Sequence, residues 1–183
     1  MKFQQTEVLL KNNDIITIQI CDIEDAEELL RTVKTYLADS EYIPVRPEEF
    51  TISIEKEKLR IRSFLENDNS LLLIAKKGNE ILGNIDITGS QKEAIKHTAV
   101  IGMGMLKEYR NKGLGTALLR KGIEWARQNP VLEILWLQVY AENTAGVTLY
   151  RNAGFEINGI QKKFFKSKEN IYFDNVIMSL DVR

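Results

Sequence analysis

Apolar and polar positions alternate near the N-terminus in the manner of two short strands. Apolar runs at residues 7–10 and 15–20 flank the polar tetrad 11–14, a pattern that predicts a hairpin. After Asp22, apolar residues recur at spacings of three and four up to residue 37, which predicts a helix with Asp22 as its N-cap.

The remaining pattern predicts a strand-rich centre followed by alternating helices and strands. Residues 39–50 hold two of the three prolines and are expected to form a loop. The expected elements after it are a helix at 53–66, a hairpin of strands at 71–75 and 81–87, a polar connection at 89–96, a strand at 97–106, a helix at 113–128, an interior strand at 131–141, a helix at 143–153 ended by Gly154, and strands at 155–161 and 171–180.

This element order predicts an α+β fold with helices layered on a mixed, mostly antiparallel sheet. One β-α-β crossover at residues 98–141 is expected to make its two strands parallel. The length of 183 residues fits a single domain, spanning residues 1–183 with its core at about 15–181.

Composition removes several classes of function. The formal net charge of −1 is not that of a dedicated nucleic-acid binder. Cys21 and His97 are the only residues of their types, which excludes an internal disulfide framework and a multi-histidine metal site. No run approaches the ~20 apolar residues of a membrane span, and no export signal stands out, so a cytoplasmic protein without membrane partners is expected.

The segment with the clearest chemistry is a basic turn with two glycines between a predicted strand and a predicted helix. Free backbone N–H groups at a helix N-terminus attract anions, and Gly113 and Gly115 allow close approach. The cations of this turn are Lys107, Arg110 and Lys112. A pyrophosphate is the natural ligand.

The spacing of the glycines in this turn narrows the choice of phosphate ligand. The ATP-binding pattern G-x-x-x-x-G-K-[ST] is absent, and a dinucleotide G-x-G-x-x-G pattern would need glycine where Lys107 or Leu118 stands. The residues present are Arg110-x-x-Gly113-x-Gly115.

This motif resembles the [QR]-x-x-G-x-[GA] acetyl-CoA motif of the GCN5-related N-acetyltransferase (GNAT) superfamily. Three further features agree with it in the right order: the preceding strand, Asn143, and the run Tyr150 to Phe155, which is similar to the family's Y-x-x-x-G-F. The predicted element order also resembles that of the family.

The resemblance implies a set of contacts to acetyl-CoA as co-substrate, with no metal. The backbone from Arg110 to Thr116 (Arg110, Asn111, Lys112, Gly113, Leu114, Gly115, Thr116) would hold the pyrophosphate. Main-chain groups of Met105, Leu106 and Lys107 would pair with the pantetheine arm, the Asn143 side chain would bind that arm, and Tyr150 would lie at the thiol. Asn143 and Tyr150 are seven residues apart and therefore share one helix face.

The implied reaction is transfer of acetyl from a thioester to a primary amine. A backbone N–H at Met105 or Leu106, freed by a strand bulge at Gly102 and Gly104, is the expected oxyanion donor. Tyr150 is the expected catalytic acid, since a phenol of pKa ~10 can donate to a thiolate. His97 and Asp86 are both expected to lie too far along the strands to act as a base. No protein base is therefore assigned, and the default is a water molecule as base or direct attack by an already neutral amine.

Several features keep a second interpretation. Asn143 is also a good N-cap, Tyr150 could simply pack, and Cys21 reads as a small core residue. Acids of the 39–50 loop are either solvated or attract a cationic amine: Asp39, Glu41, Glu48 and Glu49.

The expected acceptor is a small-molecule amine or a peptide N-terminus. The alternative function is a non-catalytic CoA-binding regulatory or scaffold module. An exposed C-terminal strand makes a homodimer possible.

Overall fold

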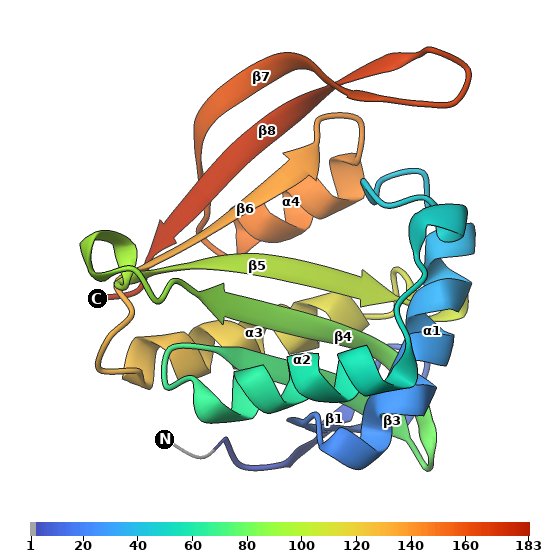
Figure 1. The fold of residues 1–183 in the computed structure, drawn as a ribbon, viewed down its shortest axis with the longest axis vertical. Helices are drawn as coiled ribbons and strands as arrows, with labels where there is room; N and C mark the ends of the chain where they lie inside the picture. Colours follow the sequence, from blue (N-terminus) through green and yellow to red (C-terminus); the bar gives the residue numbers. More distant parts are fainter. Residues whose placement is uncertain (1–2) are drawn as a thin grey trace.

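The computed structural model describes residues 3–183 and confirms the predicted order of elements (Figure 1). The strands are β1 (Thr6–Leu9), β2 (Ile15–Ile20), β3 (Leu71–Lys77), β4 (Glu80–Gly89), β5 (Thr98–Met105), β6 (Ile134–Tyr140), β7 (Glu156–Lys166) and β8 (Tyr172–Asp181). The helices are α1 (Ala26–Ala38), α2 (Ile54–Glu66), α3 (Leu114–Gln128) and α4 (Thr144–Asn152), with short 3-10 turns at 23–25, 47–49, 93–95 and 107–109.

The eight strands form one sheet in the order β1-β2-β3-β4-β5-β6-β8-β7. Only β5 and β6 are parallel, as the crossover through α3 requires. Their pairing is limited to Thr98–Val100 opposite Ile134–Trp136, and beyond it the two strands diverge (Figure 1). The sheet is therefore split along its middle, and the split widens toward the C-terminal ends of β5 and β6.

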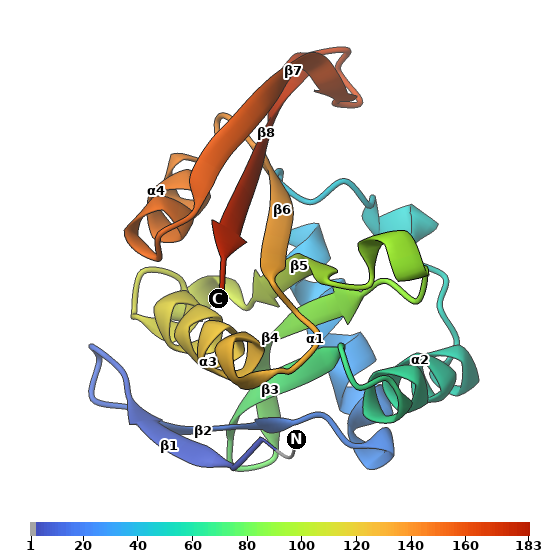
Figure 2. The ribbon, with the colours of Figure 1, turned by 90° about the vertical axis from the view of Figure 1, so that its left-hand side faces the viewer.

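Each face of the sheet has its own hydrophobic core. Helices α1 and α2 cover one face, and α3 and α4 cover the other (Figure 2). In the smaller core, α1 and α2 pack against side chains of β3 and β4 such as Leu72, Ile74 and Ile81. The larger core packs α3 and α4 against alternate positions of the same strands, such as Leu73 and Ile85. This alternation explains why the central strands are nearly continuous apolar runs.

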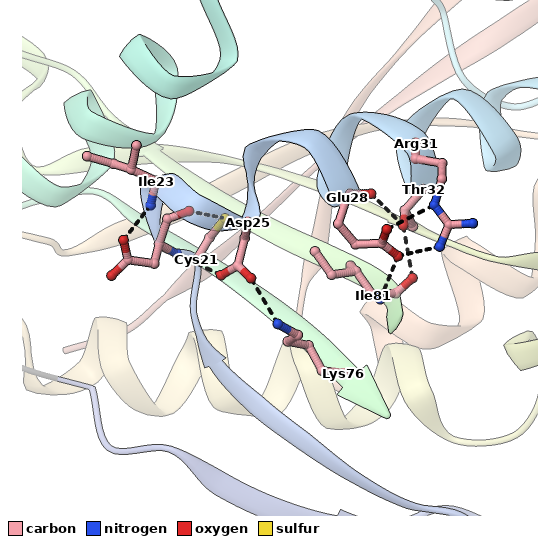
Figure 3. A network of polar contacts seen from close by, with 9 residues as sticks. Cys21, Ile23, Asp25, Glu28, Arg31, Thr32, Lys76 and Ile81 are labelled. Atoms are coloured by element: carbon pink, nitrogen blue, oxygen red, sulfur yellow. Dashed lines mark hydrogen bonds and ion pairs between the residues drawn. The ribbon is translucent and has the colours of Figure 1, made fainter. Parts of the chain in front are cut away.

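Helix α1 is tied to the sheet by a polar network (Figure 3). The Asp22 carboxylate accepts a hydrogen bond from the Ile23 amide at 2.6 Å, and Asp25 pairs with Lys76 of β3 at 2.9 Å. About two turns further on, the Thr32 hydroxyl donates to the carbonyl of Ile81 on β4 at 2.9 Å. These contacts fix the rotation of α1, so that Tyr36, one turn after Thr32, faces the sheet near β5.

The C-terminal strand differs from the expectation. Strand β8 is paired on both sides, with β6 and with β7, so its edges are not free for a dimer. The edge strand of this half of the sheet is β7. Within residues 3–183, none of the helices is both long and apolar enough to cross a membrane.

Candidate active site

A cavity of about 770 Å³ opens where β5 and β6 diverge. Eight of the predicted site residues line it: Met105, Arg110, Asn111, Gly113, Gly115, Thr116, Asn143 and Tyr150. Four others do not: Leu106 and Leu114, which are buried in the core, and Lys107 and Lys112. The structure thus brings together the predicted turn, the end of β5 and the cavity-facing side of α4.

The two motif glycines serve different purposes at the start of α3. Gly113 is the N-cap with φ +93°, a left-handed conformation that disfavours other residues. The first helical bond runs from the Ala117 amide to the Gly113 carbonyl at 3.0 Å, so the amides of residues 114–116 have no acceptor within the helix. At Gly115, an added Cβ would lie 2.9 Å from Met105 Cε. Close packing and free amides therefore coincide at this helix end.

The cations of the turn are not arranged as expected. The Arg110 guanidinium donates to the Asp39 carbonyl at 3.1 Å and to the Met105 carbonyl at 3.5 Å, which ties the turn to the 39–50 loop and to β5. The Lys112 ammonium lies 5.6 Å from the centre of the Tyr109 ring. Lys11, from the β1–β2 turn, lines the cavity instead. Sequence spacing could not reveal it, because Lys11 is about a hundred residues away from the motif.

The expected oxyanion donor was the backbone N–H of Met105 or Leu106. This expectation is wrong for Leu106 and stays a prediction for Met105. The Leu106 amide donates to the Leu82 carbonyl of β4 at 2.9 Å and is not free. The β4–β5 register runs without interruption from Gly83 opposite Met105 to Gly89 opposite Ala99, so β5 has no bulge there. Successive amides of a strand point to opposite edges, and the Met105 N–H therefore points toward the gap left by β6. The Met105 N–H is therefore left without a strand partner because β6 diverges from β5, and not because β5 has a bulge.

The glycines of β5 make room for side chains from neighbouring elements. A Cβ on Gly104 would lie 2.3 Å from Tyr36 Cζ, and one on Gly102 would lie 2.9 Å from Asp86 Oδ1. The Tyr36 hydroxyl donates to Asn84 Oδ1 at 3.1 Å. Both glycines thus allow polar groups to approach the β5 backbone on the α1–α2 face.

Asp86 is not where the sequence placed it. It pairs with Gly102 in the middle of β5, rather than with the start of that strand. Burial raises the pKa of Asp86, and the nearby Arg60 guanidinium opposes this rise. Burial, and after it the Asp86 charge, raises the pKa of both Tyr36 and Tyr150, which places all three groups in one electrostatic neighbourhood. The sequence analysis missed the β4–β5 register. The connection of eight residues at 90–97 allows β5 to pair with β4 in a register different from that of a tight hairpin.

Helix α4 contributes the two side chains that the resemblance implied. Asn143 caps the helix, with its Oδ1 accepting from the Gly146 amide at 2.9 Å, and its Nδ2 has no partner among residues 3–183. Tyr150 is buried, stands edge-on to Phe155 with ring centres 5.8 Å apart, and lines the cavity. Burial raises the pKa of Tyr150 to about 12, so its hydroxyl is protonated at neutral pH.

His97 and Cys21 take no part in the cavity. The His97 carbonyl accepts from the amides of Glu133 and Ile134 at the end of β5 opposite the gap. Cys21 is buried in the core beneath α1, and burial raises the pKa of its thiol, as the sequence predicted for a small core residue.

The far side of the cavity is formed by the end of α1 and by the loop between α1 and α2. Tyr36, Ser40, Tyr42 and Ile43 line it, whereas the acids of that loop do not. Glu48 pairs with Lys168 of the β7–β8 turn at 2.5 Å, and Tyr42 stands against Tyr140 of β6 with ring centres 5.8 Å apart. The loop is therefore in contact with both the β7–β8 turn and β6.

Comparison with known proteins agrees with this geometry. The model of the acetyltransferase (GNAT) family matches residues 30–155, and the chain belongs to that family. An acetyltransferase of the GNAT family from Streptococcus pneumoniae superimposes with a TM-score of 0.88 and 27% identity over 91% of this chain and 99% of that one.

Two curated relatives match a shorter stretch. The L-amino acid N-acetyltransferase AaaT of Escherichia coli is 28% identical over 92 residues, which are 50% of this chain and 57% of that protein. The N-alpha-acetyltransferase RimI of Mycobacterium tuberculosis is 26% identical over 92 residues, 50% of this chain and 56% of that protein. The chain thus spans somewhat more than half the length of these two relatives.

Proposed function

We propose that this protein is an acetyl-CoA-dependent N-acetyltransferase that moves an acetyl group directly to the primary amine of a small molecule or a peptide N-terminus. The single observation that carries the proposal is the continuity of one cavity. It extends from the free amides at the start of α3, past the open edge of β5, to the tyrosines on the α1–α2 side. A donor entering from one side and an acceptor from the other would meet in the gap.

The residues present fit the chemical groups of CoA. The amides of residues 114–116 and the positive end of the α3 dipole suit the pyrophosphate. The open edge of β5 near Met105 suits the amides of the pantetheine arm, which would bind as an added strand. The free Nδ2 of Asn143 suits a carbonyl of the same arm.

Two groups are suited to the charges that develop during acyl transfer. The Met105 N–H is the assigned oxyanion donor, because the amide of Leu106 is already bonded to β4. Tyr150 is assigned to the leaving sulfur. With its pKa raised to about 12, complete proton transfer to a thiolate of pKa ~8.5 would be uphill by about 5 kcal/mol. Tyr150 therefore acts as a hydrogen-bond donor to the sulfur.

The acceptor side is suited to an amine that attacks as the free base. Tyr36, Ser40 and Tyr42 offer hydroxyl groups and aromatic edges, and the Asp86 carboxylate lies beyond Gly102 on the same face of the sheet. Its negative charge favours an amine over an anion in this part of the cavity. The two curated relatives are named for acetylation of an L-amino acid and of an α-amine, which makes α-amines the first acceptors to test.

The alternative is a CoA-binding module without turnover. Both functions predict CoA binding, and only the enzyme predicts release of free CoA thiol that depends on an amine. The test is calorimetry with CoA, followed by a thiol-release assay with acetyl-CoA and a panel of L-amino acids, N-terminal peptides and diamines. Saturable binding with amine-dependent thiol release is expected. Binding without release on any amine would favour the module, and no binding would refute both.

A further inference from the structure

The β1–β2 turn is docked on the chain that enters α3, although the two segments are far apart in sequence (Figure 2). The Lys11 amide donates to the Lys112 carbonyl at 3.0 Å, and the side-chain Cγ of Lys11 lies 3.7 Å from the position of a Cβ on Gly113. The turn lies outside residues 30–155, which the family model matches. It lies at the edge of the predicted phosphate site.

The turn is held in one conformation by its own polar groups. The Leu10 amide donates to the Asp14 carbonyl at 2.8 Å, and the Asp14 carboxylate accepts from Asn12 Nδ2 at 2.7 Å and from Lys77 Nζ at 2.6 Å. Asn13 adopts φ +64°, which asparagine tolerates better than most residues. Because Lys77 already neutralises Asp14, the acid of the turn does not neutralise Lys11.

Positive charge at the start of α3 has to come from somewhere other than the motif lysines. Arg110 also lines the cavity, with guanidinium N–H groups bonded to the carbonyls of Asp39 and Met105, and the Lys112 ammonium lies over the Tyr109 ring. Lys107 and Lys112 do not line the cavity, whereas Lys11 does. Among residues 3–183, Lys11 has no carboxylate within salt-bridge distance. Its side chain lies beside Gly113, where helix α3 begins.

We infer that Lys11 binds the diphosphate of CoA, and that the N-terminal hairpin serves as an accessory clamp on the phosphate site. This inference rests on the proposed function. A lysine ammonium and helix N-terminal amides are complementary to the same anion, and a docked turn loses little entropy on binding it. The hairpin therefore contributes affinity for the donor and plays no part in the choice of acceptor.

The test is calorimetric titration of CoA into wild-type protein, Lys11→Ala, Lys11→Arg and Lys92→Ala. Truncation at residue 11 keeps the backbone bond to Lys112, so the hairpin should stay docked. For Lys11→Ala we expect CoA binding about 5- to 20-fold weaker with unchanged thermal stability, because the contact is charged but exposed. Lys11→Arg should restore most of the affinity. Lys92→Ala removes one equivalent charge from the distant 89–96 connection and should match the wild type.

Further measurements separate the possible outcomes. With 3′-dephospho-CoA, Lys11→Ala should lose the same factor; loss of the effect would place the contact at the 3′-phosphate and overturn the assignment to the diphosphate. A larger effect of Lys112→Ala than of Lys11→Ala would show that the turn supplies its own charge, which also overturns it. Wild-type protein that binds CoA while Lys11→Ala binds equally well refutes this inference alone. Wild-type protein that binds no CoA refutes the proposed function.

Discussion

At Gly104, addition of a single methyl group should displace a side chain of the cavity and destabilise the fold. Its alanine Cβ would lie 2.3 Å from Cζ of Tyr36, whereas carbon atoms in contact are normally ~3.5–4.0 Å apart. The Tyr36 ring is buried, and its hydroxyl bonds to Asn84, which is itself buried. The ring therefore has to move by more than about 1 Å, and the hydrogen bond to Asn84 is lost with it.

These two effects set the size of the change. Overpacking in a core costs about 1–3 kcal/mol, and leaving buried polar groups unpaired costs about 1–3 kcal/mol. Gly104→Ala should therefore reduce the free energy of unfolding by about 2–6 kcal/mol, measured by urea denaturation of the variant and the wild type in one buffer. Gly159→Ala is the matched control. A Cβ at that strand position meets no atom within 4 Å, and its effect should stay within about 1 kcal/mol.

A double-mutant cycle tests the cause. If the Tyr36 ring is the obstacle, Gly104→Ala should cost much less in a Tyr36→Leu background than in the wild type. A Gly104→Ala variant as stable as Gly159→Ala would refute the reasoning. So would an unchanged cost in the Tyr36→Leu background, because the strain would then lie in the backbone of β5.

The remaining predictions concern the chemistry and charge of the cavity. Tyr150→Phe should lower kcat about 10- to 100-fold, the loss of one hydrogen bond to a charged sulfur, with the CoA Kd within about twofold; wild-type turnover would contradict this role. Because the folded pKa of Asp86 is raised, ionised Asp86 destabilises the fold above that pKa and costs nothing below its unfolded pKa of about 4. Asp86→Asn should accordingly raise the free energy of unfolding at pH 8 and lose this advantage toward pH 4; equal gains at both pH values would contradict the assignment. Gly113→Ala should cost about 1–2 kcal/mol for its positive φ and weaken CoA binding, both seen by calorimetry, with partial recovery in Gly113→Asn; unchanged CoA affinity would contradict the role of this turn.

Local sequence signals were sufficient for the elements and for most of the donor side of the cavity. The spacing of apolar residues predicted each helix to within a few residues, and Gly154, with φ +97°, ends α4 as expected. The turn around Gly113 and the shared face of Asn143 and Tyr150 were predictable because each lies within one continuous segment.

Features that depend on the relation between segments were not predictable in the same way. The length of the connection before β5 allowed several registers, and the one formed brings Asp86 opposite Gly102. Likewise, the sequence suggested a bulge in β5. The gap between β5 and β6 instead arises because the two strands stop pairing after Val100 and Trp136. Both outcomes depend on how twisted strands pack on two separate cores.

The sequence by itself determined the order of strands and helices, the parallel crossover and the free amides at the start of α3, because these follow from local periodicity and backbone preferences. Tertiary structure decided which charges reach the cavity. Of the motif cations, Arg110 lines the cavity while it is bonded to the Asp39 carbonyl, and Lys112 lies over the Tyr109 ring outside the cavity, whereas Lys11 comes from a separate hairpin. The physical reason is that a side chain's direction depends on the packing of its whole element, which no short window of sequence contains.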